Sequence, residues 1–373
     1  MSNLSVNTIT NAAGGNTAQI NGMTPTAQSL QGFRNRLINS DMRIDQRNAG
    51  ASVTQSSSVV YALDRWASFG TVTSKFTVQR NAGAVTPPPG FTNYIGCTST
   101  SAYSVGASEL YEIFQSIEGF NTADLNWGTA SAQPVTLSFW VRSSLTGTFG
   151  GFLNNSASNR VYPYSYTISS ANTWEYKTVT IAGDTTGTWL TNNGTGIQVA
   201  FNLGCGSSIS GTANAWNSGT AFGPTGAVSV VGTNGATFYI TGVQLEAGSV
   251  ATPFERRPYG TELQLCQRYA IVYTQETAFC RIATGSSFEA TTAVYQTAFP
   301  VEMRALPTIT TSDLSHFRDV FPARVASPSA LVWSEGSRKT AGFNTTNTGF
   351  TVGQAGWFST SNASARMTFS AEL

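Results

Sequence analysis

The stretch VTLSFWVR at residues 135–142 decides the fold class of this chain. Its apolar side chains occupy every second position: Val135, Leu137, Phe139 and Val141. A period of two is that of a β-strand that buries one face and turns the other toward solvent. The stretch IQVAFNL at residues 197–203 repeats the pattern. Both stretches are rich in β-branched and aromatic residues, and they predict half-buried strands.

Further short strand candidates flank these two, each bounded by Gly, Asn, Pro or Asp: residues 75–80, 91–97, 174–181 and 236–245. No helical segment stands between them, so we expect an antiparallel sandwich or barrel formed by residues 51–258. Strand-like segments then continue to the last residue: 291–299, 306–311, 329–334, 349–352 and 366–373. They predict a second β-sandwich domain at residues 259–373. Residues 259–273 fit either a short helix or a strand.

The first 50 residues have a different character. Residues 1–23 are rich in Asn and Thr and predict an extended arm that pairs with another subunit or a partner protein, or else a frayed terminus. Residues 24–50 predict a short helix and linker, because a Thr-Pro-Thr start at Thr24 suits a helix N-terminus. The candidate anchor and oligomer contacts are apolar: Leu4, Val6 and Ile9 in the arm, and Leu30, Phe33 and Leu37 at helical spacing.

Composition excludes several classes of protein. Only 10% of the 373 residues are charged and the net charge is +1, whereas an ordinary domain is about 25% charged. Without a basic excess, we expect no nucleic-acid partner. No run of 18 apolar residues is present, so we expect no membrane insertion. The first 15 residues lack a basic and an apolar region, which predicts synthesis and folding in a cytosol without a signal peptide.

Catalytic and metal-binding groups are scarce. The single histidine, His316, has no nucleophile motif near it, and we interpret it as a loop residue. The four cysteines are spread widely, which predicts reduced, buried thiols and no zinc site: Cys97, Cys205, Cys266 and Cys280. Glycoside hydrolysis needs only two carboxylates, but no spacing singles out such a pair. We therefore expect no enzyme activity, no catalytic residues, no metal and no cofactor.

Carbohydrate binding fits the composition better. Trp127, Trp189 and Trp216 stand among Gly, Asn and Thr in expected loops, where an indole ring is available to stack on a sugar. These three are the candidate glycan-binding residues. The alternative is that they cap the ends of the sandwich. Trp140 and Trp174 lie on expected strands, and we assign them to the core.

Four segments together resemble a family of virion appendage proteins of tailed bacteriophages: NRLINSDMRIDQRNAG at residues 35–50, SFWVR at 138–142, YITGVQLEAG through PFERR at 239–257, and LCQRY at 265–269. The resemblance implies a jelly-roll sandwich similar to carbohydrate-binding modules, in a tail fibre or other virion structural protein that is often a homotrimer. Sugar-binding relatives of this sandwich often hold a structural Ca²⁺, to which Glu246 or Asp64 would contribute. The resemblance carries no defined sugar site.

The resulting hypothesis is a tail fibre or spike component on the exterior of the virion. Its residues 1–23 would attach to other virion proteins, its chains would form a homotrimer, and its β domains would contact bacterial surface glycan during host attachment. Two alternatives stay open: a capsid-bound decoration protein or head fibre, and a glycan depolymerase.

Overall fold

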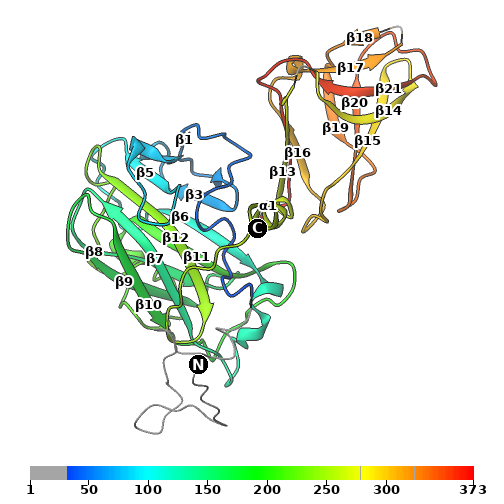
Figure 1. The fold of residues 1–373 in the computed structure, drawn as a ribbon. Helices are drawn as coiled ribbons and strands as arrows, with labels where there is room; N and C mark the ends of the chain where they lie inside the picture. Colours follow the sequence, from blue (N-terminus) through cyan, green and yellow to red (C-terminus); the bar gives the residue numbers. More distant parts are fainter. Residues whose placement is uncertain (1–31, 278, 323) are drawn as a thin grey trace, which may run out of the picture.

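The computed structural model describes residues 32–373 apart from residues 278 and 323, and these form two β units joined by a short helix (Figure 1). The N-terminal unit is a sandwich of two six-stranded sheets. Sheet I has the order β1 (Val53–Thr54), β4 (Phe76–Arg80), β5 (Ile95–Ser99), β12 (Thr237–Ala247), β7 (Val135–Ser143) and β10 (Glu175–Ile181). Sheet II has the order β2 (Val60–Leu63), β3 (Trp66–Gly70), β6 (Leu110–Glu118), β11 (Thr195–Cys205), β8 (Gly147–Asn154) and β9 (Val161–Ile168).

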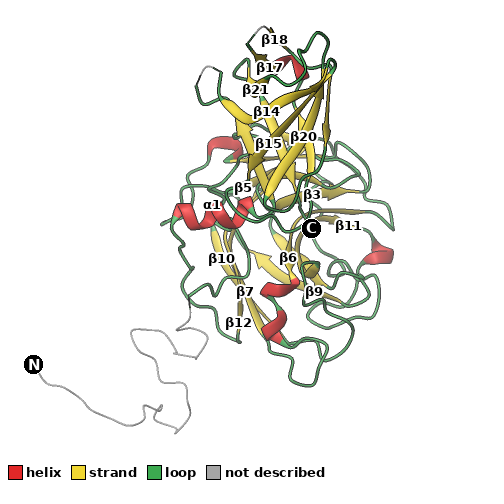
Figure 2. Ribbon diagram, turned by 90° about the vertical axis from the view of Figure 1, so that its right-hand side faces the viewer, coloured by secondary structure: helices red, strands yellow, loops and turns green. Residues whose placement is uncertain are grey.

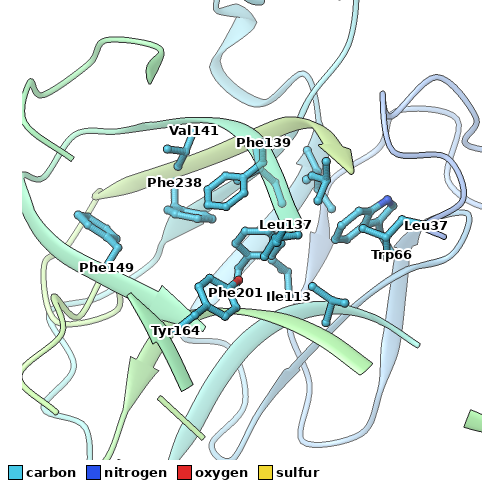
Figure 3. Packing of buried hydrophobic residues seen from close by; sticks show 14 of the residues in the cluster. Leu37, Trp66, Ile113, Leu137, Phe139, Val141, Phe149, Tyr164, Phe201 and Phe238 are labelled. Carbon is cyan, nitrogen blue, oxygen red and sulfur yellow. The ribbon is translucent and has the colours of Figure 1, made fainter. Parts of the chain in front are cut away.

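All paired strands of both sheets are antiparallel, which confirms the prediction of an antiparallel sandwich. The inner face of β7 is fully buried, as its alternation requires. Phe139 of sheet I meets Phe201 of sheet II edge to face, with ring centroids 5.0 Å apart. Trp66, Tyr164 and Phe238 surround Phe201 in the same apolar layer (Figure 3). Aromatic packing of this kind stabilises the contact beyond the area that it buries.

The C-terminal unit is also all β, as predicted (Figure 2). Helix α1 (Tyr259–Gln267) leads into it, so the ambiguous segment 259–273 contains a helix followed by a strand. A three-stranded sheet has the order β13 (Ala270–Thr274), β22 (Arg366–Ser370) and β16 (Thr308–Thr311). A seven-stranded sheet, curled into a half-barrel, has the order β18 (Arg324–Ala326), β17 (Phe317–Phe321), β21 (Ala355–Thr360), β14 (Arg281–Glu289), β15 (Thr292–Ala298), β20 (Thr340–Thr346) and β19 (Ala330–Trp333).

Short 3₁₀ turns complete the described chain: η1 (Ala82–Ala84), η2 (Gly119–Asn121), η3 (Ala123–Leu125), η4 (Ser207–Ile209) and η5 (Leu314–His316). The strand expected at residues 349–352 is wrong, because Gly349 and Gly353 adopt left-handed φ angles of 77° and 83° and turn the chain there. Among the described residues, no helix has the length and apolar character that a membrane span requires.

Residues 32–50 of the expected helix and linker at 24–50 contain no helix, which corrects the prediction for these residues, and residues 24–31 lie outside the described part of the chain. Asn35 is the reason: its side-chain nitrogen donates to the Val243 carbonyl at 2.9 Å, and its side-chain oxygen accepts from Leu245 N at 3.1 Å. Asn39 likewise binds the backbone of Ile44 and Asp64. Side-chain bonds to the backbone outcompete a helix here. Residues 35–50 therefore pack as an irregular segment against the sandwich.

Polar contacts join the two units. Glu118, at the end of β6, accepts two hydrogen bonds from Arg268 at 2.8 and 2.6 Å and one from the Tyr269 hydroxyl at 2.7 Å. Glu372 forms ion pairs with Arg47 and Arg65 of the sandwich. We call these residues the joint. The Glu118 and Glu372 carboxylates and Arg65 are almost completely buried. Loss of any one of them would leave an unpaired buried charge, which is strongly destabilising.

Glu112 of β6 is a buried carboxyl group in sheet II. It is 4% exposed, and its Oε2 atom has no hydrogen-bond partner among the described residues. Its partner across the strand pair is Asn202 of β11, whose Oδ1 atom is also buried and unpaired. Burial raises the pKa of Glu112 from 4.5 to about 8. At neutral pH the folded protein therefore holds a proton on this group.

We predict that the stability of the sandwich falls as pH rises from about 4.5 to about 8, because the unfolded chain releases the Glu112 proton first. Glu112→Gln removes this dependence and makes the protein more stable than wild type at pH 9, by on the order of 4 kcal/mol. Urea unfolding curves between pH 4 and pH 9 measure the effect. Glu289→Gln, at an exposed carboxylate, is the control. Parallel pH profiles for wild type and Glu112→Gln would contradict the prediction.

Candidate functional site: a tryptophan pocket

The structure brings together the three tryptophans that the sequence singled out. They come from three connections between strands: Trp127 between β6 and β7, Trp189 between β10 and β11, and Trp216 between β11 and β12. The ring centroids lie 4.7 Å apart for Trp127 and Trp189, 5.3 Å for Trp127 and Trp216, and 5.5 Å for Trp189 and Trp216. All three pairs are nearly perpendicular. The rings form one cluster at the edge of the core.

The indole N–H groups of the cluster all donate to acceptors of the chain itself. Trp127 donates to the Gln133 carbonyl at 2.7 Å, and Trp216 donates to the Ala182 carbonyl at 2.8 Å. Trp189 donates to Thr186 O at 3.1 Å and to the Asp184 carboxylate at 3.3 Å. The donors are thus satisfied internally, and what the cluster presents outward is ring surface.

Asp184 organises this part of the sandwich. Its carboxylate, 2% exposed, receives two hydrogen bonds from Arg160 at 2.7 Å each and further ones from the Thr186 backbone and hydroxyl. Burial alone would raise the pKa of Asp184, but the bonds from Arg160 and Thr186 outweigh burial and hold it below its ordinary value. The Arg160 guanidinium also lies 5.9 Å from the Trp216 ring centroid. Asp184 therefore fixes the loop that carries Trp189.

A pocket of about 140 Å³ opens beside two of the rings. Its lining combines ring and aliphatic surface with hydroxyl and amide groups: Thr122, Ala123, Asn126, Trp127, Thr129, Trp189, Leu190, Thr191 and Ile197. One water needs only about 10–15 Å³ measured in the same way, so the pocket holds a larger guest. Gly128 keeps the two walls close, since its left-handed φ is 85° and an added Cβ would lie 2.7 Å from Gly187 O. Apolar walls with a few polar groups are typical of small-ligand sites.

The three tryptophans differ in their exposure. Trp127 is 7% exposed and belongs to the core, while Trp189 and Trp216 are half-buried against it. Of the three, Trp127 and Trp189 line the pocket, and Trp216 supports them from behind. Packing against the core and lining of a pocket thus occur within the same cluster. Their role in glycan binding stays a prediction.

Sequence reasoning missed a second aromatic surface. Trp140 was assigned to the core, but it lies half-buried on the outer face of sheet I, beside the exposed Tyr176 of β10 at a centroid distance of 5.4 Å. Trp174 is also half-buried and packs on Tyr94 at 5.5 Å. The signal for Trp140 was present, because the alternation of β7 places it on the face opposite Phe139 and Val141.

The candidate anchor residues have different outcomes. Leu4, Val6, Ile9 and Leu30 lie outside the described residues. Phe33 is 60% exposed and stays available to a partner. Leu37 is completely buried in the core of the sandwich, so its assignment as an oligomer contact is corrected. The arginines of this segment pair within the chain: Arg36 with Asp124, Arg43 with Asp41, and Arg47 with Glu372.

The residues considered for chemistry are dispersed. Asp64 accepts hydrogen bonds from Gln46 N and Nε2, and Glu246 accepts bonds from Thr252 N and its hydroxyl. Within the described residues, no group of three or more His, Cys, Asp or Glu side chains is placed to hold a metal. His316 lies in η5, and its ring contacts the Ser312 hydroxyl at 3.0 Å. Cys97 and Cys266 are buried as expected, whereas Cys205 and Cys280 are partly exposed, and all four are free thiols.

Neither the known family models nor the curated proteins contain a match to this chain by sequence. Solved structures show distant similarity. The enzymatically active domain of tailspike protein 4 of bacteriophage CBA120 aligns with 49% of this chain and 19% of its own, at 13% identity and a TM-score of 0.30. A family 11 carbohydrate-binding module from Clostridium thermocellum, in complex with a β-1,3-1,4-mixed-linked tetrasaccharide, aligns over 55% and 100%, at 12% identity and 0.27. A family 61 carbohydrate-binding module with β-1,4-galactotriose aligns over 49% and 88%, at 11% identity and 0.25. No family is identified.

We predict that Asp184→Asn loosens the tryptophan cluster and lowers the free energy of unfolding at pH 7 by about 2 kcal/mol, because Arg160 loses a charged partner. Because the pKa of Asp184 is depressed, its stabilisation is complete above the ordinary value of 3.8 and is lost as pH falls through the lower folded-state pKa. The variant lacks this acid dependence. Urea titrations followed by tryptophan fluorescence measure both effects.

Asp124→Asn is the matched control, since Asp124 pairs with Arg36 but is 53% exposed. Its effect should stay below about 1 kcal/mol. Equal destabilisation by the two variants would show that Asp184 has no special role in the cluster.

Proposed function

We propose that this chain is a carbohydrate-binding virion appendage protein of a tailed bacteriophage, and that its tryptophan pocket contacts sugars of the bacterial surface. The pocket supports the carbohydrate-binding part of this proposal. Two ring walls meet there at right angles, and threonine hydroxyls and the Asn126 amide surround them. A sugar ring has the same mixed character, with C–H faces and hydroxyl edges. Tryptophan suits such a guest because it is large, stiff and amphipathic.

The size of the pocket favours one kind of ligand. A pocket of about 140 Å³ suits a single sugar ring or the end of a glycan chain, whereas a long chain would need an extended groove. The outer face of sheet I, with Trp140 and Tyr176, is the competing location for a chain lying flat. A tryptophan-to-alanine substitution at each location, Trp189 in the pocket and Trp140 on the sheet face, distinguishes the two.

We predict that Trp189→Ala weakens binding to recognised polysaccharides by about tenfold or more, because one wall of the pocket is lost. Binding is measured on an array of bacterial and plant polysaccharides and then by calorimetry. Trp140→Ala is the matched control, because it removes the same side chain from the outer face of sheet I.

A second variant separates binding from folding. Ala123→Gln fills the exposed rim of the pocket without altering the tryptophan cluster, and it should reduce binding while the unfolding curve stays unchanged. Loss of binding in Trp140→Ala alone would move the site to the sheet face. A wild-type protein that binds no polysaccharide on the array would refute the function.

The virion half of the proposal rests on the sequence resemblance of residues 35–50, 138–142, 239–257 and 265–269 to appendage proteins. In the structure these segments pack together: Asn35 binds β12, the Asn39 backbone N–H donates to the Glu262 carboxylate of α1, and β7 pairs with β12. The location would be the exterior of the particle, with a homotrimer as the assembled form. We propose no catalytic role. The buried carboxylates Asp64, Asp184 and Glu118 are each held by donors of the chain itself, and the buried Glu112 lies within sheet II rather than in the pocket lining.

Two experiments separate the remaining alternatives. Labelled antibodies on intact particles distinguish a tail fibre from a capsid-bound decoration protein or head fibre. Release of new reducing ends from host polysaccharide would identify a depolymerase and overturn the binding-only role.

The arm is tested by truncation. We predict that deletion of residues 1–23 leaves a folded oligomer, because the described core begins at Leu37, but abolishes incorporation into particles. Unfolding curves, light scattering and immunoblots of purified particles measure the three properties. Normal incorporation of the truncated chain would show that the arm is not the anchor.

A further inference from the structure

The outer face of the seven-stranded sheet carries two arginines side by side. Arg281 of β14 and Arg318 of β17 are both cross-strand partners of Ser359 in β21. Directly opposed residues share one face of a sheet, with Cβ atoms about 5 Å apart at each step. The two guanidinium groups therefore project from the same face, on either side of one small residue. Arg318 Nε donates to the Ser359 hydroxyl at 3.1 Å.

Aromatic rings hold both guanidinium groups. Arg281 lies over the Trp357 ring, with 4.1 Å between its Cζ atom and the ring centroid. Arg318 lies over the Phe279 ring at 3.7 Å. Stacking on a ring fixes the plane of a guanidinium while leaving its N–H edges available. Both arginine side chains are therefore largely ordered before a ligand binds, and binding costs little further side-chain entropy.

The two cations lack anionic partners. Across residues 32–373, with 278 and 323 excepted, neither Arg281 nor Arg318 takes part in an ion pair, and the Arg281 side chain makes no hydrogen bond. The contrast within the same unit is Arg338, which pairs with Glu302 at 2.8 Å. The neighbouring positions on the face are Thr284, Trp357 and Val320, with no carboxylate among them. The face thus has positive charge and unused donors.

We propose that this arginine pair binds the carboxylate of an acidic sugar, such as a uronic acid, and forms a second glycan-recognition surface that is separate from the tryptophan pocket. This inference deepens the proposed function and rests on it for the choice of a glycan. The guanidinium fork matches the planar geometry of a carboxylate, which it binds through two parallel N–H···O bonds. Threonine and serine hydroxyls on the same sheet supply partners for the sugar hydroxyls.

The test compares polygalacturonate with its fully methyl-esterified form, which has the same backbone without the charge. The full-length protein should bind the acid form, and the double variant Arg281→Gln/Arg318→Gln should bind it about tenfold or more weakly. Arg338→Gln removes the same charge from the same unit and should bind as wild type does. Circular dichroism and unfolding curves verify that the variants fold.

Each outcome has a defined meaning. Equal binding of the acid and methyl-esterified forms, or equal loss in Arg338→Gln, overturns the proposal. Equal binding of polyglutamate shows that the surface takes any acidic polymer, and this also overturns the assignment to a sugar. Trp189→Ala should leave polygalacturonate binding unchanged. Arginine-dependent binding without any effect of Trp189→Ala on neutral glycans would refute the pocket while supporting this surface.

Discussion

The apolar layer between sheets I and II fixes which face of the sandwich every other strand residue occupies. Phe139 and Phe201 meet across this layer, and Trp66, Tyr164 and Phe238 close it around them. A strand that slipped by one residue would move its whole apolar set to solvent, so register is strongly specified here. Because this layer fixes the register of the strands, the loops between strands can bring rings and polar groups together at the edge of the core without disturbing the sheets. The tryptophan cluster is the result.

The period of two in residues 135–142 and 197–203 was enough to predict the sandwich, since strand alternation is a local property. The same alternation places Trp140 on the outer face. The assignment of Trp140 to the core was wrong because it relied on the apolar character of tryptophan and not on the alternation. The three loop tryptophans were identifiable by their Gly and Asn neighbours, but their meeting depends on how three connections pack. The error at Leu37 has a similar cause: helical spacing was visible, whereas the bonds of Asn35 to Val243 and Leu245 join residues over 200 positions apart.

The joint bears directly on the pocket. Glu118, which binds Arg268 and Tyr269, lies four residues before Thr122 in the pocket wall. On the opposite wall, Asn193 follows Thr191 by two residues, and its carbonyl accepts from Arg304 of the C-terminal unit at 2.8 Å. Both loops that form the pocket are therefore held by residues beyond α1. The C-terminal unit acts as a brace for the pocket as well as carrying its own arginine pair.

Buried ion pairs such as those of Glu118 and Glu372 contribute little net stability, because desolvation offsets much of their attraction. In the joint these pairs fix the orientation of the two units relative to each other. Rotation would separate a buried carboxylate from its arginine, which is strongly unfavourable. A fixed angle between the two proposed recognition surfaces would have a consequence for binding. One glycan would engage both surfaces only if the spacing of its sugars matched the distance between them, and the second contact would then strengthen binding through effective concentration. The same weak sugar contacts would thus discriminate between polymers by shape, which a flexible linker would not permit.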